Sequence, residues 1–314
     1  MKSFFIINPA AGKEAGKQEF IKKAEDIGQK LKMNVSVYTT KEKGDGFRFV
    51  REVCSTFRGE ELRFFACGGD GTMNEVINAL DGTEKVSFGV VPLGTGNDFV
   101  RNFGDSDLFL DLKAQLMGNI CPIDLIWYSS RLGQEYREGY AGNMINIGFD
   151  ANVVARTNEF KKNPFLPGTA AYLLGVFSTL IRKEGANLRV EIDGQEVHRG
   201  KLLLCTAANG CFCGGGIKGL PLAVLDDGLM DISIIKDVSR WTFLRLFPKY
   251  AKGRHLETKT AETVVKYYQR FNTAVKTQAE PLQICIDGEL AYSEELTLTL
   301  IPRAAQFVKP CIFV

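Results

Sequence analysis

The sequence predicts a two-domain fold, in which an α/β N-terminal domain with a parallel sheet precedes a mainly antiparallel β C-terminal domain. In the first third of the chain, short apolar runs alternate with stretches whose apolar residues recur at helical spacing. This alternation is typical of a parallel sheet covered by helices. After about residue 121, β-leaning runs follow one another and Asp-Gly pairs at 193–194, 227–228 and 287–288 separate them, as in antiparallel sheets.

The individual elements follow from these patterns. In the first domain, we expect strands at 3–8, 35–39, 62–67 and 86–91, and helices at 15–32, 47–57 and 74–80. In the second domain, we expect strands at 123–128, 140–146, 188–192, 201–207, 230–235, 282–286 and 296–301, and helices near 168–182 and 240–252. The predicted domains span residues 1–122 and 123–303, and the apolar tail 304–314 is expected to return to the first domain as a strand.

Composition limits the classes of protein that this chain can represent. The 314 residues are 45% hydrophobic and 24% charged, with a net charge of +2, so no strongly basic surface indicates a nucleic-acid partner. The eight cysteines are scattered and lie mostly in apolar runs, which favours buried thiols in a reducing compartment. We therefore expect a cytoplasmic protein. The uncharged stretch 164–181 contains prolines and glycines, which favours a buried or lipid-facing helix over a membrane span.

Two glycine-rich segments carry the main functional signal. Residues 68–75 read Gly-Gly-Asp-Gly-Thr-Met-Asn-Glu and residues 92–98 read Pro-Leu-Gly-Thr-Gly-Asn-Asp. Each follows a predicted buried strand and precedes a stretch compatible with a helix. Glycines at such a turn let backbone N–H groups approach a phosphate, and the helix N-terminus adds partial positive charge. Tight turns without a ligand are the alternative explanation.

The ordered set of motifs resembles the diacylglycerol/sphingosine lipid-kinase family, specifically its bacterial soluble members. Besides the two glycine segments, the matching motifs are Asn8-Pro9-Ala10-Ala11-Gly12-Lys13, Asn209-Gly210 with Gly214–Gly216, Asp226–Asp231 and Asp287-Gly288-Glu289. The resemblance covers nearly the whole chain. It implies a phosphofructokinase/NAD-kinase-like first domain that binds ATP and a second domain that accepts a lipid, most simply diacylglycerol giving phosphatidic acid.

The resemblance and the chemistry of the residues together indicate the nucleotide contacts. Phosphoryl transfer requires positioning and neutralisation of charge, which backbone amides, hydroxyl and amide side chains and a carboxylate for Mg²⁺ provide. Asp70 is expected to hold Mg²⁺ or to orient a bound group, and Thr40 is preferred to Thr39 on spacing. The expected contacts are Asn8, Pro9, Ala10, Ala11, Gly12, Thr40, Gly68, Gly69, Asp70, Gly71, Thr72, Asn74, Gly94, Thr95, Asn97 and Asp98.

Glu289 is the expected general base. A lipid hydroxyl is a weak nucleophile, and a carboxylate within hydrogen-bond reach can take its proton. The resemblance assigns this role to Glu289, while Asp287-Gly288 is by itself a hairpin-turn signal that recurs at Asp193-Gly194.

The resemblance also implies a structural Mg²⁺ loop. Its ligands would be the Asp227 carboxylate and the backbone carbonyls of Val224 and Leu229, which are oxygen donors of the kind that Mg²⁺ prefers. A surface turn with two acids is the alternative.

A lipid substrate implies contact with a membrane surface. The lysines of the first helix and the mixed basic and aromatic segment 240–254 are candidates for peripheral docking on anionic lipid. A core stripe beneath solvated bases is the alternative explanation of the aromatics of 241–250. A homodimer through an edge strand is a further expectation. The other functions considered are a kinase of another lipid alcohol (a sphingoid base or phosphatidylglycerol), a kinase of a soluble acceptor, and a catalytically silent nucleotide- or lipid-binding protein.

Overall fold

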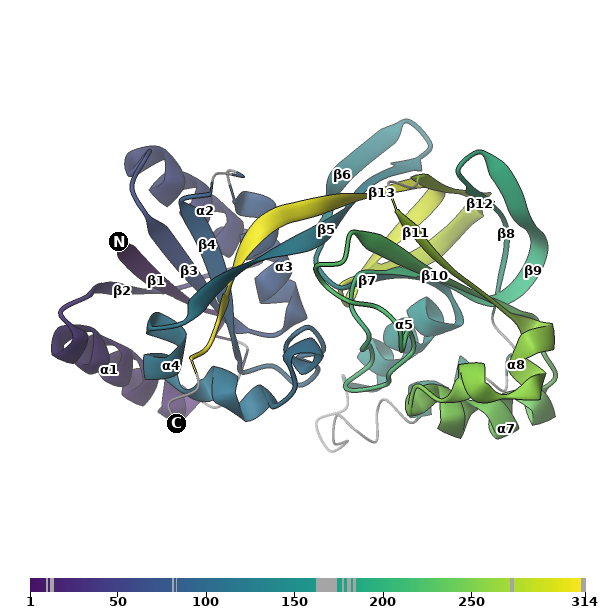
Figure 1. Cartoon of the computed structure of the whole chain (residues 1–314), viewed down its shortest axis with the longest axis horizontal. Coiled ribbons are helices and arrows are strands. Elements are labelled where there is room, and N and C mark those ends of the chain that lie inside the picture. Colours follow the sequence, from purple (N-terminus) through teal and green to yellow (C-terminus); the bar gives the residue numbers. More distant parts are fainter. Residues whose placement is uncertain are drawn as a thin grey trace. The chain divides into compact units, whose positions relative to one another are not determined.

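The computed structural model describes residues 1–9, 11, 14–80, 82, 84–161, 174–176, 178–179, 182, 185–271 and 274–311. The chain forms two compact units (Figure 1). Met1–Asp124 and Arg303–Val314 make the first unit, and Leu125–Pro302 makes the second. Strands β5 (Asn119–Leu132) and β13 (Glu289–Lys309) each have residues in both units. The domain bounds expected from the sequence lie within two residues of those observed.

The first unit is built on a sheet of parallel strands. The strands are β1 (Lys2–Ile7), β2 (Asn34–Thr39), β3 (Leu62–Gly68) and β4 (Val86–Pro92). Their order is β2-β1-β3-β4, and each of these pairings is parallel. The end of β13 adds a further parallel pairing, in which Phe307 lies opposite Phe88. The tail strand expected from the sequence is therefore the end of β13.

Helices cover both faces of this sheet. They are α1 (Glu14–Leu31), α2 (Asp45–Thr56), α3 (Asp70–Ala79), η1 (Val100–Phe103), η2 (Ser106–Leu110) and α4 (Leu112–Leu116). Adjacent residues of β1 point to opposite faces: the ring of Phe4 packs 5.9 Å from Phe49 of α2, and the ring of Phe5 packs 5.9 Å from Phe20 of α1. Because both faces are covered, Phe4–Ile7 is a continuous buried apolar run.

An aromatic cluster attaches the returning strand to the first unit. The ring of Phe307 lies 4.7 Å from that of Phe103 and 5.2 Å from those of both Phe88 and Phe99. Phe307 is fully buried. The apolar residues of the tail are thus part of the core of the first unit.

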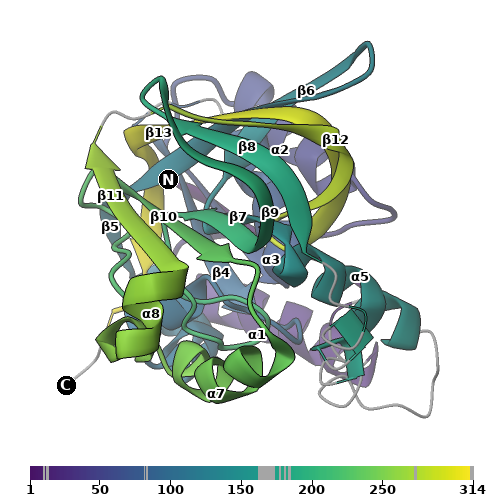
Figure 2. The ribbon, with the colours of Figure 1, turned by 90° about the vertical axis from the view of Figure 1, so that its right-hand side faces the viewer.

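The second unit is antiparallel (Figures 1 and 2). Its further strands are β6 (Glu135–Ala141), β7 (Met144–Gly148), β8 (Ala186–Ile192), β9 (Gln195–Ala208), β10 (Leu229–Lys236), β11 (Val265–Phe271) and β12 (Ala274–Ile286). The order β11-β10-β9-β7-β12-β13 is antiparallel throughout, and β8 pairs with both β9 and β12. The helices are α5 (Phe149–Lys161), α7 (Arg240–Ala251), η3 (His255–Glu257) and α8 (Lys259–Val264).

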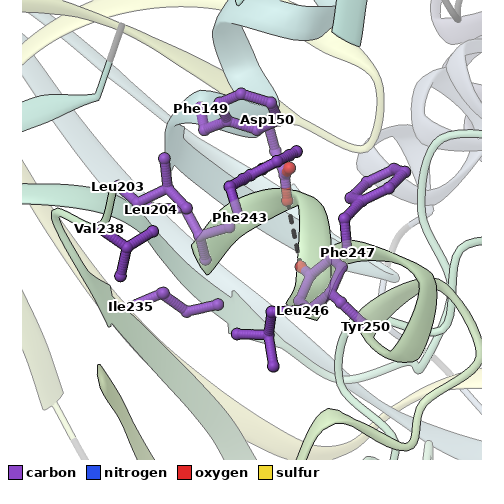
Figure 3. Close-up of a pocket in the computed structure, with 10 residues that line it drawn as sticks. All are labelled: Phe149, Asp150, Leu203, Leu204, Ile235, Val238, Phe243, Leu246, Phe247 and Tyr250. Carbon is purple, nitrogen blue, oxygen red and sulfur yellow. Dashed lines mark hydrogen bonds between the residues drawn. The ribbon is translucent and has the colours of Figure 1, made fainter. Parts of the chain in front are cut away.

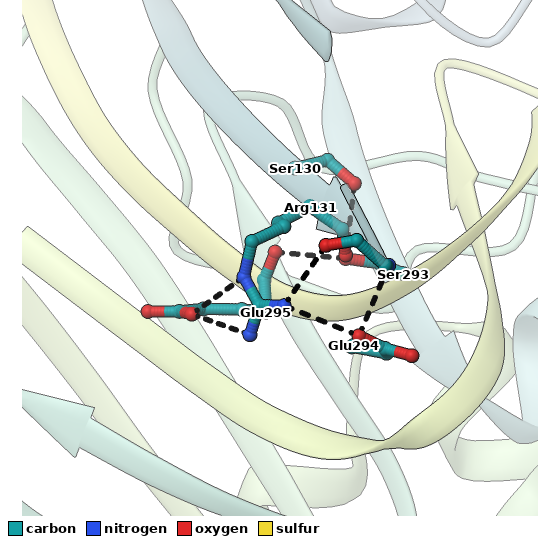
Figure 4. A network of polar contacts seen from close by, with 6 residues as sticks. Ser130, Arg131, Ser293, Glu294 and Glu295 are labelled. Atoms are coloured by element: carbon teal, nitrogen blue, oxygen red, sulfur yellow. Dashed lines mark hydrogen bonds and ion pairs between the residues drawn. The ribbon is translucent and has the colours of Figure 1, made fainter. Parts of the chain in front are cut away.

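A polar network joins β5 to β13 within this unit (Figure 4). The Arg131 guanidinium donates to Glu295 at 3.0 and 3.1 Å and to Glu294 at 3.3 Å. Beside it, the Ser130 hydroxyl donates to the Ser293 hydroxyl at 2.9 Å. Arg131 of β5 therefore binds two neighbouring carboxylates of β13.

Several expected elements have different bounds in the structure; for example, the strand expected at 282–286 begins at Ala274. The strand expected at 140–146 is interrupted, because β6 ends at Ala141 and β7 begins at Met144. The helix expected at 74–80 begins at Asp70, so much of the first glycine segment is helical. The helix expected near 168–182 lies largely outside the described residues. In the part of the chain that the structure describes, no helix has the length and apolarity needed to cross a bilayer.

Candidate functional site

Polar residues follow the strands of the parallel sheet at the edge where their carboxyl ends meet. Asn8 follows β1, Thr40 follows β2, and segments 68–70 and 92–98 follow β3 and β4. The N–H of Asn8 donates to the carbonyl of Cys67 at 3.0 Å, and that of Thr40 donates to the end of β1 at 2.9 Å. Parallel α/β sheets bind ligands at this edge, so the expected contacts are placed where a ligand is bound in such folds.

The two glycine segments pack directly against each other. The N–H of Gly94 donates to the carbonyl of Gly68 at 3.1 Å. A β-carbon on Gly94 would lie 2.6 Å from the Cα of Gly69, and one on Gly68 would collide with the side chain of Thr72. Gly68 and Gly94 are therefore required by packing, whether or not a ligand binds.

The Asp70 carboxylate ties the first glycine segment to the second. It accepts hydrogen bonds from the N–H groups of Asp98 at 3.3 Å and Phe99 at 3.4 Å. Asp98 is buried and lies 3.7 Å from the Arg101 guanidinium, which also donates to the carbonyl of Gly96 at 3.3 Å. Asp70 and Asp98 thus lie in one polar cluster.

The N-terminus of α3 opens at this cluster. Gly69 is the N-cap residue and supplies no side-chain hydrogen bond to the helix. The N–H groups of a first helical turn lack intrahelical acceptors and favour an anion. Thr72 is buried and accepts from the Asn8 side-chain amide at 3.2 Å, while Asn74 is half-buried and accepts from Asn78 at 3.2 Å. Gly71 lies in this first turn.

The tip of the second glycine segment contains an unsatisfied acceptor. Asn97 has a left-handed backbone with φ of 52°, and its side-chain amide donates to the carbonyl of Gly94 at 2.7 Å. Its Oδ1 atom is buried and has no hydrogen-bond partner among the described residues. Thr95 is exposed beside it. A buried acceptor without a donor is costly, which is compatible with a ligand that donates here.

The first motif is only partly described. Ala11 donates its N–H to the carbonyl of Asn8 at 3.0 Å, so Ala11 lies close to the end of β1. Ala10 and Gly12 lie outside the described residues. Of the two threonines considered, Thr40 is buried whereas Thr39 is exposed.

Glu75 has a positioning role that the sequence did not reveal. Its Oε1 atom accepts from the N–H of Gly44 at 2.8 Å, at the N-terminus of α2. A β-carbon on Gly46 would lie 2.8 Å from Oε2 of the same carboxylate. Next to it, Asp45 accepts hydrogen bonds from the Lys41 N–H and the Tyr38 hydroxyl, which lower the pKa of Asp45. The Gly44-Asp45 pair therefore organises the start of α2 beside the Thr40 turn.

In the second unit, Asp287 organises a separate polar cluster. Its carboxylate accepts from the N–H groups of Gly142 at 2.7 Å, Asn143 at 3.0 Å and Met144 at 2.9 Å. Asp287 is buried, with 4% of its surface exposed. Because these three N–H groups bind a carboxylate, the backbone turns at 142–143 and the strand expected at 140–146 is divided.

Glu289 is held at the start of β13 by the same hairpin. Asp287 and Gly288 have φ of 46° and 88°, and Ile286 pairs with Glu289 across the turn, as the Asp-Gly signal predicted. The Glu289 side chain is exposed. Asn209 is fully buried and donates to the carbonyl of Gly142 at 3.3 Å.

The Asp227 loop is a tight turn before β10. The Asp227 carboxylate accepts from the N–H of Leu229 at 2.9 Å, and Gly228 has φ of 74° with the ring of Phe271 against it. Val224 is exposed. The described residues contain no group of three or more His, Cys, Asp or Glu that could hold a metal ion, but the expected ligand set relies on carbonyls and a single carboxylate.

A buried carboxylate follows this loop. Asp231 accepts from the Tyr267 hydroxyl at 2.5 Å. Burial raises the pKa of Asp231 to about 6, and burial together with the neighbouring carboxylate raises the pKa of Tyr267 well above its ordinary value. The Asp226–Asp231 motif therefore combines an exposed turn with a buried acid on β10.

Comparisons with known proteins cover almost the entire chain. Residues 2–127 match the family model described as "Diacylglycerol kinase catalytic domain", and residues 143–309 match "YegS C-terminal NAD kinase beta sandwich-like domain". A protein of Mycobacterium tuberculosis named "Diacylglycerol kinase" is 30% identical over 77% of this chain and 75% of its own length. A "Probable lipid kinase YegS-like" protein of Shewanella frigidimarina is 29% identical over 88% of this chain and 84% of its own.

The fold is similar to that of solved structures. A crystal structure of a diacylglycerol kinase from Bacillus anthracis superposes with a TM-score of 0.69 and 20% identity, over 98% of this chain and 96% of that one. At this identity, the likeness concerns the fold alone.

Proposed function

This chain belongs to the bacterial family of diacylglycerol kinases and YegS-like lipid kinases, and we propose that it transfers the γ-phosphoryl group of ATP to the hydroxyl of diacylglycerol, giving phosphatidic acid. The observation that carries the donor half of this proposal is the packing of the two glycine segments around the N-terminus of α3. Kinase family membership implies the use of ATP.

The first unit supplies the phosphate-binding groups. The N–H groups of residues 69–71 lie at the start of α3, where the positive end of the helix dipole would favour a phosphate anion. Asn8 and Thr72 form one hydrogen-bonded pair beside that helix end, and Asn74 lies one turn further on. Pro9, Ala11, Thr40 and Thr95 complete the proposed nucleotide contacts, together with Ala10 and Gly12.

Asp70 would hold Mg²⁺, whose chemistry is to neutralise charge on the phosphates. The two carboxylates fit this role because both lie beside Gly96, on which a β-carbon would be 3.1 Å from Oδ2 of Asp70 and 3.8 Å from Oδ2 of Asp98. Mg²⁺ typically takes one or two carboxylates together with phosphate oxygens. The N–H groups of Asp98 and Phe99 orient the Asp70 carboxylate. Asp70 therefore has a positioning role within the protein in addition to any contact with the ion.

Glu289 would take the proton of the lipid hydroxyl. As it does so, the hydroxyl oxygen forms a bond to the γ-phosphorus, and the bond between this phosphorus and the oxygen of the departing ADP breaks. Its exposure on the first residue of β13 leaves the carboxylate accessible to an acceptor. The backbone that carries it is fixed by Asp287, which is bound to three N–H groups. A rigid support of this kind favours a defined position for a general base.

The assay that tests this function uses ATP labelled in its γ-phosphate, Mg²⁺ and separate vesicle preparations containing diacylglycerol, a sphingoid base or phosphatidylglycerol. We expect label in the lipid extract with diacylglycerol and none with Glu289→Gln. Strongest labelling of another lipid would overturn the choice of acceptor. Label released only as inorganic phosphate would show that water, and none of these lipids, accepts the phosphoryl group. ATP binding without any labelled product would indicate a silent binding protein.

A further inference from the structure

Helix α7 has a buried face that fixes it to the second unit. Phe243, Leu246 and Tyr250 are buried at helical spacing, and the ring of Phe243 lies 4.9 Å from that of Phe149. Ser239 caps the helix by accepting from the N–H of Thr242 at 3.1 Å. This buried face is the core stripe that the sequence analysis gave as the alternative. It does not include every aromatic residue of the helix.

The buried face lines a small cavity (Figure 3). The cavity has a volume of about 30 Å³ and contains a hydrogen bond of 3.4 Å from the Tyr250 hydroxyl to Asp150. Such a volume has room for about one or two water molecules and not for an acyl chain. This cavity, as the described residues line it, is therefore too small for an acyl chain, and the exposed face of α7 is the one available to a lipid surface.

The outward face of α7 combines an exposed aromatic with basic residues. Trp241 is 79% exposed and Leu244 is 44% exposed, while Arg245, Lys249 and Lys252 are exposed beside them. The helix sequence from Arg240 to Ala251 contains no acidic residue. A solvated surface requires neither an exposed indole nor an exposed leucine, whereas a helix that lies in a membrane interface uses both together with lysine and arginine.

We propose that this outward face, defined as Trp241, Leu244, Arg245, Lys249 and Lys252, docks the protein on a negatively charged lipid surface. The inference rests on the proposed function for the need to reach a bilayer. Charge complementarity favours a negatively charged lipid surface as the partner of this face. Among the described residues, Arg245, Lys249 and Lys252 form no ion pair that would neutralise their charges. By contrast, Arg254 nearby is paired with Glu257 at 3.2 Å.

The same composition argues against a second copy of the chain as occupant. Two outward faces placed against each other would bring like charges together without an acid to separate them. An anionic membrane neutralises each basic residue and receives the apolar side chains between its headgroups.

Tryptophan fluorescence gives a direct readout of docking. The chain has two tryptophans, Trp127 and Trp241, so Trp127→Phe leaves Trp241 as the only indole. We expect its emission to shift to shorter wavelength with vesicles of phosphatidylcholine and phosphatidylserine, and not with phosphatidylcholine alone. An unchanged emission in the presence of bound vesicles would contradict the proposal.

A charge-reversal pair tests the basic residues. Each basic side chain near an anionic surface contributes about fivefold to partitioning, so the double variant Arg245→Glu/Lys249→Glu should lose at least about 25-fold in co-sedimentation with the anionic vesicles. Lys201→Glu/Lys276→Glu is the matched control, because both lysines are exposed on strands and the change in net charge is the same. Equal binding by the two variants would overturn the assignment to α7, as would binding that does not respond to salt.

Activity separates this inference from the proposed function. If both hold, the α7 variant loses phosphorylation of diacylglycerol in anionic vesicles but keeps that of a dispersed short-chain diacylglycerol. If the wild type phosphorylates neither acceptor yet binds vesicles through α7, the docking surface stands and the kinase assignment fails. If the wild type is active on vesicles and the variant is equally active and bound, the docking surface fails and the kinase assignment stands.

Discussion

Gly69 and Gly94 lie so close to each other that a β-carbon on Gly94 would be 2.6 Å from the Cα of Gly69. The relation is not symmetrical, because a β-carbon on Gly69 would meet the Cα of Gly94 at an ordinary 3.6 Å. Gly69 also has an extended backbone with φ of −98°, which any residue adopts. Packing therefore explains why residue 94 is glycine. No packing contact of the described residues requires glycine at position 69.

This asymmetry predicts different effects of alanine at the two positions. Gly94→Ala should reduce the free energy of unfolding by ~2 kcal/mol, because overpacking displaces the backbone of the neighbouring segment. Gly69→Ala should change it by less than ~0.5 kcal/mol, since the loss of a good N-cap residue and the reduced freedom of the unfolded chain offset each other. Thermal unfolding of both variants in the absence of nucleotide measures this difference.

If a phosphate of ATP approaches Gly69, the Gly69→Ala variant should bind ATP at least ~10-fold more weakly, although its stability is nearly unchanged. The reason is that the added methyl group would lie between the backbone N–H groups and the phosphate. Calorimetry measures the ATP affinity. Unchanged ATP affinity in a stable Gly69→Ala protein would place the phosphates elsewhere.

The two glycine segments could be identified from the sequence. Which of their glycines serve packing and which leave room for a ligand could not. The contact between Gly69 and Gly94 joins positions on separate strand ends, and only the parallel order of β3 and β4 brings them together. Similarly, the start of α3 at Asp70 was missed because glycine is a poor helix former, whereas in the structure Gly71 lies in the first turn. The preference for Thr40 over Thr39 as a nucleotide contact stays a prediction; Thr40 is buried just after β2, whereas Thr39 is exposed.

Asp287→Asn should destabilise the second unit. Its carboxylate accepts three N–H bonds in a buried position, and hydrogen bonds to a charged acceptor contribute about 1.5–3 kcal/mol. An asparagine keeps part of this network, so a loss of ~2 kcal/mol in the free energy of unfolding is expected from thermal unfolding. Asp193→Asn is the matched control, because Asp193 occupies the same type of turn with φ of 52° but is exposed. Equal stability of the two variants would contradict the role of Asp287.

Glu289→Gln should affect chemistry and leave the fold intact. The side chain is exposed, and glutamine occupies the corresponding place after the other Asp-Gly turn, at Gln195. We expect turnover to fall by at least ~100-fold, the lower range for loss of a general base, with unchanged thermal unfolding and ATP affinity. Retention of most of the turnover would exclude Glu289 as the base.

The Asp-Gly pairs show where sequence information ends. The turns at 193–194 and 287–288 were both predicted, and Ile192 pairs with Gln195 as Ile286 pairs with Glu289. Nothing local distinguishes Asp287 from Asp193, because the N–H groups that Asp287 binds are at residues 142–144, far away in the chain. The strand predicted at 140–146 is divided between β6 and β7 for the same reason, since its interruption depends on that long-range contact.

Asp150 should make stability depend on pH. Burial raises its pKa from 3.8 to about 6, so the folded state binds more protons than the unfolded state between these values, and the contribution to stability falls as pH rises from about 4 through 6. Asp150→Asn keeps the acceptor for Tyr250 and removes this loss. It should stabilise the protein at pH 7 by ~1–2 kcal/mol, after allowance for the favourable first-turn position of the carboxylate in α5.

Thermal unfolding at pH 4 and pH 7 checks the sign of this effect. The advantage of Asp150→Asn over the wild type should be present at pH 7 and vanish towards pH 4. An advantage that grows as pH falls would show that the Asp150 carboxylate is stabilised as the anion in the folded protein.

The Asp227 loop provides a test of the expected Mg²⁺ site that does not depend on catalysis. A cation that binds the folded loop stabilises it by RT ln(1 + [Mg²⁺]/Kd), about 1.4 kcal/mol at ten times Kd. Mg²⁺ without nucleotide should therefore raise the thermal midpoint of the wild type and do so less in Asp227→Asn. Asp226→Asn is the matched control, because it removes one exposed carboxylate from the neighbouring position. Equal Mg²⁺ shifts in both variants would mean that the loop is an ordinary turn, in which the Asp227 carboxylate serves only to accept the N–H of Leu229.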